Sequence, residues 1–143
     1  DEVTRDVSYI GDVVLSTAFV TGSDITGYVI WDEWRGQTSQ RNMFNKDVAI
    51  SYDRLIFLKD GYYHISMNGS AGSDGTDISV KFQLNGDTSN VLRSSAEGAT
   101  SLRATTIIEH SMLVKRGDYI QFYATNMEGY DDYMNGLQIR RLN

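Results

Sequence analysis

The sequence has 143 residues, which suits one compact core and is short for two ordinary domains, so we expect a single domain over residues 1–143. Hydrophobic residues make up 41% and charged residues 22%, a globular balance that excludes a disordered, collagen-like or coiled-coil chain. The 13 basic residues are scattered and outnumbered by 19 acidic ones, for a net charge of −6, which argues against nucleic-acid binding. Because there is no cysteine, disulfides, thiolate metal sites and cysteine nucleophiles are excluded.

The first residues of the sequence lack the basic-then-apolar order of a signal peptide. The chain also has no run of ~18 uncharged apolar residues, so we expect no membrane insertion. Residues 1–12 lead into the first predicted strand, and we interpret them as a candidate N-terminal attachment segment.

The first half of the chain contains five segments rich in β-branched and aromatic residues, which predict strands. These segments are 12–20, 27–32, 48–52, 55–58 and 62–67. The stretch between Asp32 and Lys46 is polar and has no sustained period, so it predicts a long surface loop.

The second half alternates more strictly between apolar and polar residues. In residues 78–84, Ile, Val, Phe and Leu share one face, and the strand runs into Asn85-Gly86, a dipeptide typical of tight hairpin turns. The Gly-rich residues 69–77 before it could suggest a phosphate or calcium loop, but we interpret them as a mobile hairpin loop, because the helix and the terminal Glu of such sites are missing.

Further strands are predicted at 91–94, 104–114, 119–125 and 136–142. Phe82 and Phe122 lie mid-strand on apolar faces and are expected to be buried, whereas Tyr119, Gln121 and Tyr123 should point outward. With no segment of helical spacing to join parallel strands, the strands should be antiparallel, giving an all-β sandwich or jelly roll of about ten strands.

Residues suited to catalysis are few, and we expect no enzyme. The two histidines, His64 and His110, would form a metal site only if their strands were neighbours, and histidines in strands more often make hydrogen bonds or face solvent. A Ser-His-Asp triad is not excluded by composition, although no Gly-x-Ser-x-Gly elbow occurs.

Four segments resemble, in order, landmarks of the tumour necrosis factor and complement globular-head superfamily. The segments are 57–66, 80–86, 112–122 and 135–139. In the first, Tyr63 and Ile65 would face inward. The third carries the pattern apolar-x-apolar-x-x-Gly-Asp-x-apolar-x-apolar. The resemblance implies a ten-stranded antiparallel jelly-roll β-sandwich that packs as a homotrimer around a threefold axis. Because cysteine is absent and residues 32–46 do not match, the chain looks most like the cysteine-free bacterial and bacteriophage surface members.

This resemblance favours a non-enzymatic module on a virion surface or in an extracellular setting. In that role the trimer would decorate a capsid or form the tip of a head or tail fibre, contact other virion or surface proteins, and bind a host glycan or protein receptor. Two alternatives stay open: a secreted signalling or complement-like ligand, and a carbohydrate-active jelly-roll enzyme.

The densest aromatic and acidic cluster is a loop before the last strand. We expect Tyr130, Asp131, Asp132 and Tyr133, with Trp34, to form the ligand-binding surface, since loops on a rigid scaffold are free to carry recognition residues and aromatic rings stack on sugars. Clustered carboxylates also bind calcium, the one cofactor left open, and no other metal is expected. The outward Tyr119 and Tyr123 are predicted to lie in the trimer interface.

Overall fold

The computed structural model describes residues 12–17, 24–35, 47–71, 74–128 and 136–142, with side chains described for 26–31, 47–71, 74–127 and 136–142. These residues form eleven strands and no helix, and so contain no helix that could span a membrane. The strands are β1 (Asp12–Thr17), β2 (Asp24–Tyr28), β3 (Trp31–Arg35), β4 (Val48–Ser51), β5 (Arg54–Phe57), β6 (Gly61–Ser70), β7 (Ile78–Leu84), β8 (Leu92–Ala96), β9 (Thr105–Val114), β10 (Tyr119–Glu128) and β11 (Gly136–Arg141).

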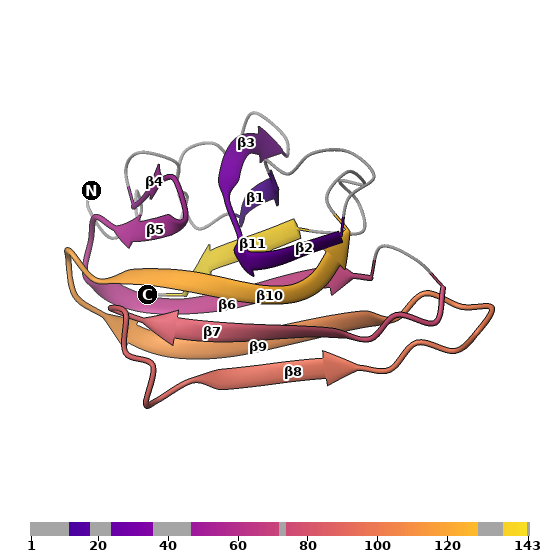
Figure 1. The fold of residues 1–143 in the computed structure, drawn as a ribbon. Coiled ribbons are helices and arrows are strands. Elements are labelled where there is room, and N and C mark those ends of the chain that lie inside the picture. Colours follow the sequence, from indigo (N-terminus) through magenta and orange to yellow (C-terminus); the bar gives the residue numbers. More distant parts are fainter. Residues whose placement is uncertain (1–11, 18–23, 36–46, 72–73, 129–135, 143) are drawn as a thin grey trace.

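The strands make two antiparallel sheets that lie face to face (Figure 1). One sheet, here the β6 sheet, has the order β3-β1-β11-β6-β9. The other, the β10 sheet, has the order β4-β5-β10-β7-β8, and β2 also pairs with β10. Contacts join β10 to β6 and β7 to β9 across the space between the sheets. The predicted all-β antiparallel sandwich is confirmed.

The core lies between the sheets, because alternate residues of each strand point inward. Phe82 and Phe122 are paired in register on β7 and β10, are 4% and 0% exposed, and have ring centroids 5.4 Å apart in an edge-to-face arrangement. Both are buried as predicted. Trp31 also packs edge-to-face on Phe122, with ring centroids 6.0 Å apart. These rings fill the space that the two sheets enclose.

The turn after β7 has the predicted conformation. Asn85 and Gly86 both have positive φ, 53° and 73°, and the Asp87 N–H donates to the Leu84 carbonyl across them at 3.0 Å. This turn does not by itself join β7 to β8, since the pairing of those strands ends at Phe82 and Leu92. The Asn85 side chain also bonds to the turn before β10: its Nδ2 donates to Asp118 Oδ1 at 3.1 Å, and its Oδ1 accepts from the Tyr119 N–H at 2.9 Å. One Asn therefore joins two turns at the same end of the sandwich.

The eleventh strand arises where a single strand was predicted at 27–32. The chain instead ends β2 at Tyr28, in the β10 sheet, and starts β3 at Trp31, in the β6 sheet. The change of sheet falls within an unbroken run of apolar and aromatic residues, so the sequence pattern contains no break to mark it.

Two loop boundaries also differ from the prediction. The loop expected from Asp32 starts later, because β3 continues to Arg35, and residues 36–46 lie outside the described residues. The loop expected over 69–77 is shorter, because β6 continues to Ser70 and pairs with Thr105 of β9. Of the proposed attachment segment, only Asp12 is described, as the first residue of β1.

Candidate functional site

Most of the predicted ligand surface lies outside the described residues. This holds for Tyr130, Asp131, Asp132 and Tyr133. The backbone of Trp34 lies in β3, paired with Leu15 of β1, and its side chain is not described. The ligand surface and a calcium ion bound there therefore stay predictions.

Tyr119 and Tyr123, the predicted interface residues, point to the outer face of the β10 sheet. The Arg54 guanidinium carbon lies 4.5 Å from the centroid of the Tyr119 ring. The Tyr123 ring packs edge-to-face on Tyr28 at 5.3 Å, and Lys81 Nζ lies 5.6 Å from its centroid. Each ring has packing partners within the chain and is only partly exposed.

Between these tyrosines, two outward-facing glutamines are buried. Gln83 and Gln121 are paired in register on β7 and β10 and are 5% and 7% exposed. The Tyr28 hydroxyl donates to Gln83 Oε1 at 3.3 Å, and Gln121 Nε2 donates to Asp53 Oδ2 at 3.2 Å. The alternation predicts the direction of Gln121 correctly but not its burial, because neighbouring side chains cover it.

The outer face of the β6 sheet carries exposed apolar side chains. Leu113 of β9 is opposite Tyr62 of β6, and the Leu142 N–H donates to the Tyr62 carbonyl on the other side. We call Leu113, Tyr62 and Leu142 the apolar row; they are 77%, 37% and 42% exposed. Ile107, further along β9 on the same face, is 60% exposed.

Beside the apolar row lies a polar group centred on His64. Its Nδ1 is 2.8 Å from Ser111 Oγ, and its Nε2 is 3.9 Å from Glu109 Oε1. These residues are the elements of a triad, and they lie on an open face of the sheet where β6 and β9 pair through their backbones.

The two histidines do not form a metal site. His64 points outward, whereas His110 points inward and packs its ring on Phe82 at 5.7 Å. The two side chains lie on opposite faces of one sheet, so the two-histidine alternative is wrong. Among the described residues, no group of three His, Cys, Asp or Glu side chains is arranged to hold a metal ion.

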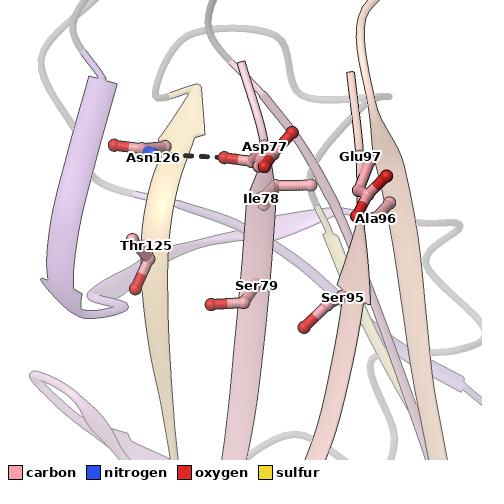
Figure 2. Close-up of a pocket in the computed structure, with 8 residues that line it drawn as sticks. All are labelled: Asp77, Ile78, Ser79, Ser95, Ala96, Glu97, Thr125 and Asn126. Carbon is pink, nitrogen blue, oxygen red and sulfur yellow. Dashed lines mark hydrogen bonds between the residues drawn. The ribbon is translucent and has the colours of Figure 1, made fainter. Parts of the chain in front are cut away.

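At one end of the β10 sheet, β7, β8 and β10 border an open cleft of about 250 Å³ (Figure 2). Three strand residues with hydroxyl side chains, two acidic residues flanking β7 and β8, and Asn126 near the end of β10 account for most of the lining, with two apolar residues beside them. The lining residues are Asp77, Ile78, Ser79, Ser95, Ala96, Glu97, Thr125 and Asn126.

Hydrogen bonds connect the rim of this cleft. Asn126 Nδ2 donates to the Asp77 carbonyl at 3.2 Å, and the Gly98 N–H donates to Asp77 Oδ1 at 3.0 Å. Asn126 has a φ of 62° and lies at an irregularity in the pairing of β10 with β2. Such bulges redirect side chains, here toward the cleft.

The sequence pattern does not predict this cleft. Ser79, Ser95 and Thr125 occupy ordinary outward positions in alternating strands, and the sequence gives no sign that they become neighbours. The residue type at position 126 is a weak signal, since Asn adopts the positive φ found there more readily than most residues do.

No protein-family model matches the sequence, and a comparison with curated proteins finds no similar sequence. Solved structures are similar in fold. A crystal structure of murine APRIL at pH 5.0 superimposes with a TM-score of 0.68 and 11% identity, covering 93% of this chain and 99% of that one. Structures of murine APRIL at pH 8.5 and pH 8.0 each give 0.62, with 14% and 13% identity, covering 92% of this chain and 98% of theirs. The chain therefore has the jelly-roll fold of tumour-necrosis-factor-like proteins.

Proposed function

We propose that this chain is a non-enzymatic recognition module that assembles as a homotrimer and binds a partner on another surface. The observation that carries the proposal is the apolar row on the outer face of the β6 sheet, in a chain whose fold is tumour-necrosis-factor-like. Exposed apolar patches on soluble proteins commonly mark contact surfaces. The family resemblance identified in the sequence makes a copy of the same chain the expected partner.

Among the side chains of the apolar row, Leu113 should contribute most to the free energy of assembly. Fully burying a Leu side chain contributes about 1.5–3 kcal/mol, and Leu113 is 77% exposed in the protomer. Arg140 of β11 is opposite His64, so charged groups lie beside the apolar row and would orient a neighbouring protomer. A ring with threefold symmetry closes by repeating one such contact three times.

The outer face of the β10 sheet is the competing assembly surface, because it carries Tyr119 and Tyr123. Light scattering on the wild-type chain should give about three times 16.1 kDa, and Leu113→Asp should give a folded monomer. The matched variant Tyr119→Ala with Tyr123→Ala should remain a trimer. The opposite pattern would move the interface to the β10 sheet, and a wild-type monomer would overturn the assembly.

For the biological setting we propose a virion-surface or other extracellular module of bacteriophage type, which decorates a capsid or forms a fibre tip and binds a host glycan or protein. The cysteine-free sequence and the family resemblance support this role. A second candidate, a secreted trimeric ligand, is supported by the similarity to the murine APRIL structures. Binding of the purified trimer to host cell envelopes would support the first, and binding only to a receptor ectodomain the second.

A further inference from the structure

We propose that the cleft between β7, β8 and β10 binds one residue of a neutral carbohydrate. The proposal rests on the recognition role proposed above, and it assigns that role a ligand class and a site. The residues that line it are not those of the predicted ligand surface around Tyr130.

The first argument is a row of unpartnered hydroxyls. Thr125 of β10 is opposite Ser79 of β7, which is opposite Ser95 of β8, so three hydroxyls lie side by side on strands ~4.8 Å apart. Within the described part of the chain, none of these hydroxyls has a hydrogen-bond partner, nor does the Glu97 carboxylate. A hydroxyl both donates and accepts, as the hydroxyls of a sugar do.

The second argument is that the rim is held in place before any ligand arrives. Asp77 bonds to Gly98 on one side and to Asn126 on the other, which links the three strand ends. Gly98 is packed so closely that an added Cβ would lie 2.7 Å from the Thr76 carbonyl oxygen. A preformed rim lowers the entropy lost on binding, which matters most for a weak ligand.

The third argument is the charge of the lining. Its only ionisable side chains are Asp77 and Glu97, so the lining disfavours phosphate, sulfate and carboxylate groups. Carboxylates accept hydrogen bonds and never donate, so the ligand must be rich in donors. Lys81 lies outside the lining, over the Tyr123 ring. A neutral sugar meets these requirements.

Size and surroundings agree with a short carbohydrate. The cleft, about 250 Å³, is smaller than the ~300–1,000 Å³ of pockets for drug-sized ligands, so it suits a single ring. Ile78 and Ala96 add apolar surface. Tyr123 is the next outward residue of β10, and its neighbour Tyr28 is 39% exposed, which offers a ring on which a second sugar residue can stack.

The test is saturation-transfer NMR on the full chain with D-glucose, D-galactose and N-acetyl-D-glucosamine, each at millimolar concentration. At least one sugar should give a signal that persists when the salt concentration is raised. Asn126→Gly keeps the backbone conformation while removing the amide, and Glu97→Gln removes the charge. Each should weaken binding about tenfold, the effect of losing one hydrogen bond.

The control is Asp74→Asn, which removes an exposed carboxylate outside the lining and should leave binding unchanged. Absence of signal from all three sugars, or binding that neither cleft variant weakens, would overturn the cleft proposal. Binding only to sulfated or sialylated sugars, lost at high salt, would also overturn it. In each of these cases the trimer mass still decides the proposed assembly separately, and binding to host envelopes decides the recognition role.

Discussion

On the outer face of the β6 sheet Leu113 is 77% exposed, whereas on the outer face of the β10 sheet Gln83 and Gln121 are only 5% and 7% exposed. Both faces obey the same alternation, so pattern alone would make each of them a solvated surface. Neighbouring side chains cover the glutamines of the β10 sheet, whereas the apolar row of the β6 sheet keeps 37–77% of each side chain exposed. An exposed apolar face gains free energy when a partner buries it, so we assign assembly to the β6 sheet. The β10 sheet, whose glutamines are already covered, is assigned to ligand recognition.

The largest expected effect on the free energy of unfolding comes from a substitution in the core, which lies beneath both faces. Phe82→Ala should lower the free energy of unfolding by roughly 3–5 kcal/mol, since it removes buried area and leaves a cavity against Phe122 and His110. Urea denaturation would measure the loss. An unchanged midpoint would mean that Phe82 does not belong to the core.

The second prediction compares matched polar residues of the two faces. Gln121→Ala should cost about 1–3 kcal/mol of unfolding free energy, because it removes the hydrogen bond that the buried Gln121 donates to the half-buried carboxylate of Asp53. Ser66→Ala, on the outer face of the β6 sheet opposite Glu109, should change it by no more than about 0.5 kcal/mol. Equal effects would show that the two faces do not differ in how they cover polar groups.

The last prediction concerns the pH dependence of stability, and its effect is confined to alkaline pH. Burial, and then the nearby negative charge of Asp47, raise the pKa of the Tyr63 hydroxyl well above its ordinary value of 10.0, and this hydroxyl donates to the Lys59 carbonyl. The unfolded chain therefore releases this proton first, and stability should fall above pH ~10 by up to about 1.4 kcal/mol per pH unit.

Tyr63→Phe should flatten this alkaline decline, and the outward-facing Tyr62→Phe is the matched control that should leave it in place. Thermal unfolding recorded between neutral and strongly alkaline pH would measure both. A decline that persists unchanged in Tyr63→Phe would assign it to another group.

Much of the fold can be predicted from the sequence, because in many segments the local alternation and turn residues favour the same structure as the packing of the two sheets. The alternation in residues 78–84 predicts β7 and the burial of Phe82, and Asn85-Gly86 predicts the turn. The change of sheet between Tyr28 and Trp31 is not predictable, because no turn residue marks it.

The candidate site is harder to predict than the fold. The cleft depends on the register of three strands that are far apart in the chain, and residues such as Ser79 look like ordinary outward positions before that register is known. The apolar row has the same origin, since Leu113 and Leu142 become neighbours only when both pair with β6.

The central position of β11 has a consequence for the making of the protein. β11 lies between β1 and β6, so a nascent chain that has emerged only as far as β10 has two halves of the β6 sheet with nothing to join them. Folding must therefore wait until residues 136–141 have left the ribosome, and pairings between such distant segments form slowly. During that interval the edges of β1 and β6 are open to other chains, so crowded synthesis and truncation before Gly136 should both favour aggregation over assembly.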